Sequence, residues 1–189
     1  MATSKLAIIN RALAVLGDEP LASLSENRLA CQVGVENYDT ALNAALARGP
    51  WRFATVKGEL SQIPSPPLNE WAYQYQIPTE CLRLERIYPD QAYEIYRDRI
   101  LTNSSAASAD YVVRDAQTEA LIPPHFELYL GFELAVLMAP ALTGSAAAQQ
   151  NAELARRANL AVSLTIDSQQ RPNRRFLSSP FVSARRGTL

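Results

Sequence analysis

Two regularly spaced stripes of apolar residues open the chain and predict a pair of helices between residues 4 and 49. The first stripe recurs every three or four positions and consists of Leu6, Ile9, Leu13 and Leu16. The second has the same spacing and consists of Cys31, Val35, Tyr38, Leu42 and Ala45. This is the period of an amphipathic helix, so each stripe predicts one face packed against a core.

Capping residues indicate where the first predicted helix ends and the second begins. Gly17 suits the left-handed cap of the first helix, and Pro20 prevents its continuation. Ser23 with Glu26 fits a capping box for the second helix, and Ser25 is an alternative N-cap.

Residues 50–118 have a different pattern, which predicts strands. Gly49-Pro50 ends the second helix, and we expect Trp51 to fold back over the helical pair and be buried. Further on, Tyr73 and Tyr75 alternate with glutamines, the period of a half-buried strand. Other candidate strands lie at 82–88, 92–96, 100–102 and 111–113. Together they predict a small antiparallel sheet, with 103–109 as an exposed loop.

Helical patterns return after residue 119. Residues 126–138 are apolar except for Glu127 and Glu133, which predicts a helix buried on all sides. Pro140 should kink or end it. The most apolar stretch, residues 128–142, contains Glu133 and Pro140 and is shorter than the roughly 20 residues that a membrane span needs, so we expect no membrane contact. After Ser145 as N-cap, a last helix is predicted to about Ile166. Its expected inner face consists of Leu154, Ala158, Ala161 and Thr165, with Leu160 and Leu164 beside them.

These elements predict an α+β fold: a four-helix bundle with a small antiparallel β-sheet domain inserted between helices two and three, plus an extended C-terminal arm. The expected boundaries are 1–49 for the first helical hairpin, 50–118 for the β domain, 119–167 for the second hairpin and 168–189 for the arm.

Charge is unevenly distributed along the chain. The net charge is -1, from 18 basic and 19 acidic residues, which does not favour a general nucleic-acid-binding protein. All 19 acidic residues lie in residues 1–167 with 13 of the basic ones, so this part carries -6 and the arm carries +5. The two cysteines, Cys31 and Cys81, lie in apolar patterns and are expected to be buried free thiols in a reducing cytoplasm. The start of the chain has no pattern of a secretory leader.

Residue types that support catalysis are scarce. The single histidine, His125, lacks a nucleophile motif and is expected to make a local hydrogen bond at a helix start. No glycine-rich phosphate loop and no metal-type spacing occurs in the sequence, so we expect no cofactor and no metal. Paired carboxylates that could cleave a glycosidic bond remain candidates: Glu80, Glu85, Glu94 and Asp98. Arginines at 83, 86, 97 and 99 favour ion-paired surface instead.

The arm allows three interpretations. Its arginines could bind nucleic acid, it could be a disordered solubilising tail, or it could dock on a partner protein. Large apolar residues between the arginines favour docking, because a purely electrostatic tail needs no apolar anchors. The candidate binding residues are Arg171, Arg174, Arg175, Phe176, Phe181, Arg185 and Arg186. We expect the arm to be disordered in the free chain and to become ordered on a portal protein or a neighbouring subunit.

Three sequence segments resemble the tail tubular protein A family, the head-to-tail adaptors of short-tailed bacteriophages. The first reads "INRALAVLGDEPLASL … YDTALNAALARGPWRFAT". The second reads "YQYQIPTECLRLERIYPD", and the third "YVVRD … PPHFELYLGFELAVLMAPALTGS". The resemblance spans most of residues 4–166 and weakens after Asp167. It consists of aromatics, small residues and turns, and it contains no catalytic fingerprint.

The resemblance implies a structural virion protein, made in the host cytoplasm and located in the tail at the head-to-tail interface. Such proteins form a homo-oligomeric, dodecameric ring between the portal protein and the tail nozzle or next tail protein. Packaged DNA passes through the lumen during ejection without specific binding. The implied protein is not an enzyme. The alternatives are a tail-associated hydrolase of bacterial surface polysaccharide and a binding module of unknown ligand.

Overall fold

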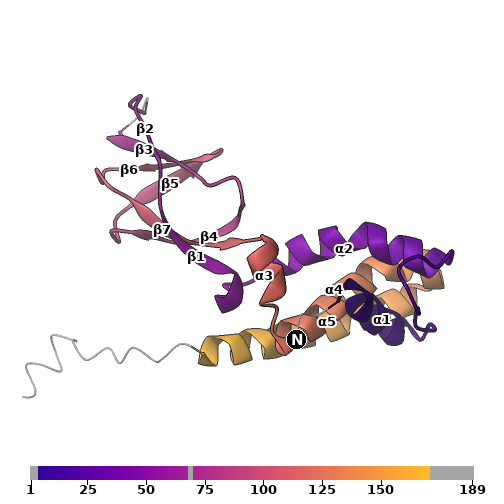
Figure 1. Ribbon diagram of the computed structural model, residues 1–189. Helices are drawn as coiled ribbons and strands as arrows, with labels where there is room; N and C mark the ends of the chain where they lie inside the picture. Colours follow the sequence, from indigo (N-terminus) through magenta and orange to yellow (C-terminus); the bar gives the residue numbers. More distant parts are fainter. Residues whose placement is uncertain (1–3, 68–69, 171–189) are drawn as a thin grey trace, which may run out of the picture.

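The computed structural model describes residues 4–67 and 70–170, apart from the side chain of Ala116 (Figure 1). Within them the chain is a mixed α+β structure with five α-helices and two small antiparallel sheets, which confirms the predicted class. The helices are α1 (Lys5–Leu16), α2 (Leu29–Ala47), α3 (Ala116–Ala120), α4 (Pro124–Thr143) and α5 (Ala146–Gln169), with a 3-10 turn η1 (Arg52–Ala54). The strands are β1 (Thr55–Glu59), β2 (Gln62–Ile63), β3 (Tyr73–Gln76), β4 (Cys81–Tyr88), β5 (Tyr93–Tyr96), β6 (Arg99–Thr102) and β7 (Ser108–Val113).

The caps of α1 follow the sequence, whereas the predicted start of α2 is wrong. Gly17 caps α1 with φ of 75°, a left-handed conformation that glycine adopts without strain. Helix α2 begins at Leu29, and its N-cap Arg28 makes no side-chain capping bond. The Glu26 carboxylate accepts the Ser23 N–H at 3.0 Å, as in a capping box, but both residues lie in a loop. The motif therefore fixes the turn between the helices and does not start α2.

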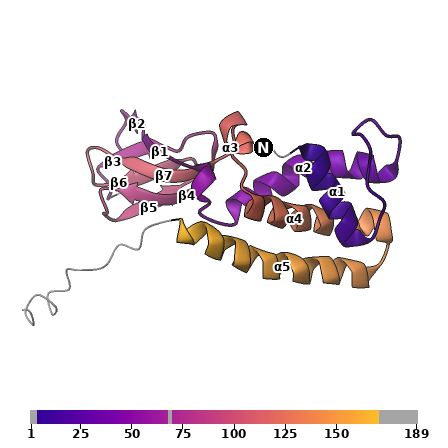
Figure 2. The same cartoon turned by 60° about the horizontal axis from the view of Figure 1, so that its bottom comes forward.

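Helix α4 is the central element of the helical part. Figure 2 shows it between α5 on one side and α1 and α2 on the other, and it packs against all three. Its length and composition alone would allow a membrane span, yet half of this stretch is buried against other parts of the protein. The largest of its buried side chains are Phe126, Tyr129, Leu130, Leu134 and Met138. Pro140 lies inside the helix, which continues to Thr143.

Trp51 is fully buried, as predicted. Its indole Nε1 donates a 2.9 Å hydrogen bond to the carbonyl of Ala45 in the last turn of α2. The ring packs edge-on to Phe126 at 4.8 Å between centroids and stacks on Tyr129 at 5.8 Å. Trp51 thereby joins the end of α2 to the first two turns of α4.

The predicted inner face of α5 is wrong for its four main residues, although Leu160 and Leu164 beside them are partly buried and pack against the core, as expected. Leu154, Ala158, Ala161 and Thr165 are exposed, and the side that packs on the helical part is the opposite one. Of the described residues of α5, those that are buried are Ala152, Arg156, Ser163 and Asp167. Three of these four are polar, so the aliphatic pattern alone selects the wrong face.

A buried ionic network explains why the inner face of α5 is polar. Glu133 of α4 pairs with Arg156 of α5 at 3.3 Å and with Arg48 at 3.2 Å, and it accepts a 2.7 Å bond from the Tyr129 hydroxyl. Arg156 also pairs with Glu153 at 2.6 Å. The hydrogen bond from Arg156 is the main cause that lowers the pKa of Glu153 to about 2, while burial raises that of Tyr129.

The sheet part contains two sheets where the sequence predicted one. The first has the order β1-β7-β4 and lies nearer the helices, and the second has the order β2-β3-β6-β5 (Figure 1). The predicted strands occur as β3, β4, β5, β6 and β7, whereas β1 and β2 were not predicted. Ala107 and Ala109, expected in an exposed loop, are buried. The two sheets enclose a small core of their own, which includes Tyr75, Ile87 and Ile100.

Both cysteines are free thiols, as expected. Cys31 is buried in α2, but Cys81 at the start of β4 is only partly covered, so the prediction of two buried thiols is half correct. The Cys31 sulfur lies 3.2 Å from the carbonyl oxygen of Leu24 and helps to hold the loop before α2.

Candidate functional site

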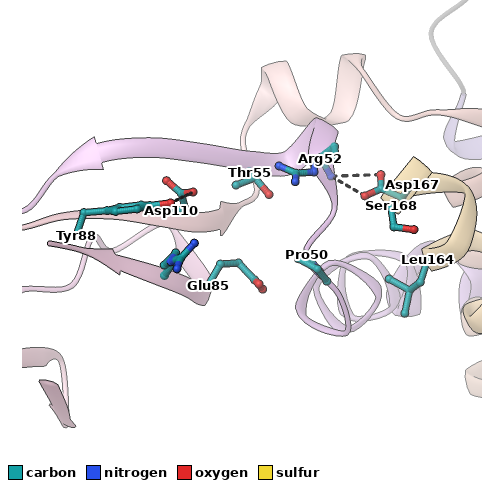
Figure 3. A pocket seen from close by; sticks show the side chains of 10 residues that line it. Pro50, Arg52, Thr55, Glu85, Tyr88, Asp110, Leu164, Asp167 and Ser168 are labelled. Carbon is teal, nitrogen blue, oxygen red and sulfur yellow. Dashed lines mark hydrogen bonds between the residues drawn. The ribbon is translucent and has the colours of Figure 1, made fainter. Parts of the chain in front are cut away.

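A cleft of about 460 Å³ lies where the sheet part meets the end of α5 (Figure 3). Strands β4 and β7 form one wall, and the end of α5 with the chain around η1 forms the other. The lining residues are Pro50, Arg52, Thr55, Glu85, Arg86, Tyr88, Asp110, Leu164, Asp167 and Ser168.

Asp167 is the central residue of the helical wall. Its two carboxylate oxygens accept the backbone N–H of Arg52 at 3.2 and 3.1 Å (Figure 3). The Nε2 atom of His125 lies 3.6 Å from Asp167 Oδ1 and has no other polar partner within the described part of the chain. Ser163, one turn earlier in α5, donates to the carbonyl of His125 at 2.9 Å. These contacts fasten the start of α4, the end of α5 and the chain entering the sheet part to one another.

The charged side chains of the strand wall form ion pairs. Glu85 pairs with Arg83 at 2.6 Å, and Arg86 pairs with Asp90 at 3.0 Å. Asp110 pairs with Lys57 at 3.6 Å and accepts a 3.4 Å bond from the Tyr88 hydroxyl. Acids and bases therefore balance around the cleft, which gives it no strong preference for a charged ligand.

The hydroxyl groups of Thr55, Ser168 and Ser163 are not arranged for nucleophilic catalysis. Thr55 Oγ1 donates to the carbonyl of Trp51 at 2.6 Å, and Ser168 Oγ donates to the carbonyl of Thr165 at 2.8 Å. The Ser163 hydroxyl likewise donates to a carbonyl, that of His125. A serine or threonine nucleophile needs its hydroxyl hydrogen directed at a base, and these three are directed elsewhere. Among residues 4–67 and 70–170, no group of three or more His, Cys, Asp or Glu side chains is placed to hold a metal ion.

The four candidate carboxylates are dispersed over four locations. Glu85 lines the cleft, whereas Glu94 and Asp98 line two different hollows of the other sheet. Glu80 accepts a hydrogen bond from Thr79 in the turn before β4. The Gln76 side chain hydrogen-bonds Asp98 and lowers the pKa of that carboxyl, the reverse of what a general acid requires. The structure thus does not bring these four residues into one described hollow.

The predicted binding residues of the arm lie outside the described residues. This applies to Arg171, Arg174, Arg175, Phe176, Phe181, Arg185 and Arg186. The junction formed by Asp167, His125 and the Arg52 amide was missed by the sequence interpretation. A signal existed, because Arg156, Ser163 and Asp167 recur with helical spacing on α5.

Replacing Asp167 by alanine should loosen this junction. The Arg52 N–H would lose both of its acceptors, so we expect the free energy of unfolding to fall by about 1–3 kcal/mol. Hydrogen exchange should show faster exchange of the Arg52 amide. Glu36→Ala is the matched control, because this exposed α2 carboxylate has no ion pair within the described chain, and it should change stability by less than about 0.5 kcal/mol. Unchanged protection of the Arg52 amide in Asp167→Ala would contradict the anchoring role.

Comparisons with known proteins do not identify a family. A scan of this chain against protein-family models finds no match, and a search of curated proteins finds none with significant similarity.

Proposed function

We propose that this protein is a structural virion protein, a head-to-tail adaptor that forms a ring between a portal protein and the tail. Its resemblance to the tail tubular protein A family is one support. In this proposal α1, α2, α4 and α5 form a four-helix bundle, and the sheet part is a domain inserted between the second and third of these helices. The arm, residues 168–189, would attach the ring to the portal or to a neighbouring copy.

The observation that carries the proposal is the exposed edge strand β5. It pairs only with β6 within the described sheet, and all four of its residues, Tyr93–Tyr96, are exposed. Tyr93, Ile95 and Tyr96 are large apolar or aromatic side chains with about half of their surface exposed. Monomeric proteins protect such edges with charges, bulges or covering loops, because free edges recruit other chains. An edge of this kind suits a subunit that is covered by its neighbours in an assembly.

The charge distribution supports passage of DNA without specific binding. Residues 1–167 carry a net charge of -6, so their surface would not hold a duplex through phosphate contacts. The ion-paired cleft and the dispersed carboxylates give no support to the alternative of a polysaccharide hydrolase.

The test of the proposal is assembly. Purified protein, alone or mixed with portal rings, should form ring particles in electron microscopy and sediment with the portal. A chain that ends at residue 170 should keep its fold and lose portal attachment. Persistent monomers that never bind portal rings would contradict the adaptor function. Turnover of bacterial surface polysaccharide that Glu85→Gln abolishes would replace it with the hydrolase.

A further inference from the structure

Strand β5 is an outer strand of the second sheet, and half of its residues direct their backbone groups away from that sheet. It pairs with β6 through a two-residue turn that follows Tyr96. The residues that flank such a turn bond each other, and bonded positions alternate along an antiparallel strand. Tyr96 and Glu94 therefore direct their N–H and C=O groups at β6. Tyr93 and Ile95 direct theirs outward, where no strand of the described sheet lies.

Strand β5 differs from the other outer strands of the described sheets. Strand β2, at the opposite edge of the same sheet, has two residues and leads into Pro64. In the first sheet β4 pairs with two register shifts, and β1 carries Lys57 and Glu59. Short strands, proline, bulges and charges all hinder the pairing of sheet edges. Strand β5 has a regular register and a single charge, Glu94, so it suits the addition of another strand better than these three do.

We propose that two copies of this chain pair through β5 as antiparallel strands, with Ile95 opposite Ile95 of the second copy. A two-fold axis between two antiparallel strands relates like faces, so the pairing is centred on one residue. Centring on Glu94 would place two carboxylates directly opposite each other, which destabilises a strand pair. Centring on Tyr93 or Tyr96 would place most of β5 opposite residues outside the strand. Ile95 is the remaining centre, and its backbone groups already point outward.

Charge complementarity on one face of β5 supports this register. Glu94 and Tyr96 share that face, and the Arg97 guanidinium lies 5.5 Å from the centre of the Tyr96 ring. In the proposed pair Glu94 lies opposite Tyr96 of the second copy, so its carboxylate meets the guanidinium over that ring. Arg97 is exposed and makes no ion pair within the described residues. The Trp71 indole bonds one oxygen of Glu94 at 3.0 Å, and no described residue bonds the other. The two-fold axis repeats this contact.

The other face of the proposed pair is apolar. Ile95 is 50% exposed and Tyr93 is 43% exposed. Ile95 lines a hollow of about 470 Å³ together with Ile77, Leu82 and Leu84. Ile95 of the second copy would lie at the rim of this hollow, so pairing removes apolar surface from water on this face. Backbone bonds, opposite charges and apolar contact thus favour the same register.

This inference goes beyond the proposed function. A two-fold pair closes on two copies, whereas a ring repeats one head-to-tail contact. The pair is therefore a state of the protein before assembly. Because the ring would cover the same edge, the pair must open before a neighbouring subunit binds β5.

Single cysteines on β5 test the register. Ile95→Cys and Tyr93→Cys are made in the full-length chain with Cys81→Ser, which removes the partly covered native thiol. In the proposed pair the two copies of position 95 lie within reach of a disulfide, whereas the two copies of position 93 are about 13 Å apart along the strands. Under mild oxidation Ile95→Cys should therefore form linked dimers at least about tenfold faster than Tyr93→Cys. Equal rates, or a faster rate for Tyr93→Cys, would overturn the proposal.

Charge reversal tests the contact between Glu94 and Arg97 independently. Glu94→Arg or Arg97→Glu, each added to Ile95→Cys/Cys81→Ser, places like charges together and should slow dimer formation several-fold. An equimolar mixture of the two variants restores opposite charges at both contacts. Mass spectrometry of the linked dimers should then show heterodimers in clear excess over the statistical half. A statistical mixture would contradict the proposed pair. Both experiments use the purified protein without portal rings, so their failure and a failure of ring assembly are separate results.

Discussion

Replacing Trp51 by alanine is expected to lower the free energy of unfolding by about 3–5 kcal/mol. The indole is fully buried, and it packs against Phe126 and Tyr129 while donating a hydrogen bond to the Ala45 carbonyl. Alanine would leave a cavity between α2 and α4 and an unused acceptor at the end of α2. Urea unfolding followed by far-UV circular dichroism measures the loss without depending on tryptophan fluorescence.

Two further variants separate the contributions of Trp51. Trp51→Phe keeps an aromatic ring but removes the indole N–H donor, so its free energy of unfolding should fall by less than that of Trp51→Ala. Trp71, the other tryptophan, is only partly buried, and its indole bonds the exposed Glu94. Trp71→Ala should therefore cost less than about 1 kcal/mol. A loss below 1 kcal/mol in Trp51→Ala as well would show that Trp51 does not hold α2 and α4 together.

The sequence predicted the existence of α1, α2, α4 and α5 because their signals are local, whereas the short helix α3 was not predicted. Apolar spacing identifies the buried faces of α1 and α2, and Gly17 and Gly144 end helices in the left-handed conformation that glycine permits. The capping-box pattern can occur in a loop as well as at the start of a helix, and here it led to a wrong start for α2. Glu26 makes the backbone bond of a capping box, yet no helix follows Ser23 directly. The structure of that loop depends on Arg28, which reaches back to Asp18 and to the carbonyl of Glu19.

The orientation of α5 could not be predicted from α5 alone. The helix has an aliphatic side and a side that contains Arg156, Ser163 and Asp167. Hydrophobicity favours burying the aliphatic side, but the polar side meets partners on other elements. Glu133 pairs with Arg156, the His125 carbonyl accepts from Ser163, and the Arg52 amide bonds Asp167. Such long-range complementarity is absent from any single window of the sequence.

Strand pairing was predictable for neighbours along the chain and not for distant segments. The hairpin of β5 and β6 follows from its short polar turn, in which Arg97 has φ of 57°. The pairing of β1 with β7 joins segments about 50 residues apart, and period-2 alternation does not say which strands pair. The junction at Asp167 was missed for the same reason, since its members come from three separate elements.

Replacing Arg156 by methionine should be as damaging as truncating Trp51, with a loss of about 3–5 kcal/mol. The Glu133 carboxylate is almost fully buried and would keep only Arg48 and the Tyr129 hydroxyl as partners. Arg157→Met is the matched control. Arg157 also bonds Glu153, but its side chain is 69% exposed against 8% for Arg156, so its loss should cost less than about 1 kcal/mol.

The double variant Glu133→Leu/Arg156→Met distinguishes a stabilising ion pair from a buried charge that merely needs its partner. Apolar replacements of both members remove the unpaired charge, so the double variant should be more stable than Arg156→Met. A loss of about 1–3 kcal/mol relative to the unmodified protein should remain, because the buried Tyr129 hydroxyl loses its acceptor. A double variant as unstable as Arg156→Met would contradict this explanation.

Acid unfolding supplies a second measurement of the same network. The pKa of Glu153 is lowered from 4.5 to about 2, chiefly by its hydrogen bond from Arg156. A carboxyl with a lowered pKa stabilises the fold above its ordinary pKa, and this stabilisation is lost as the pH falls toward 2. In Arg156→Met the pKa of Glu153 should rise toward 4.5, so the change in stability between pH 5 and pH 2 should be smaller than in the unmodified protein. An equally steep acid dependence in both proteins would show that Arg156 does not hold Glu153 in its charged form.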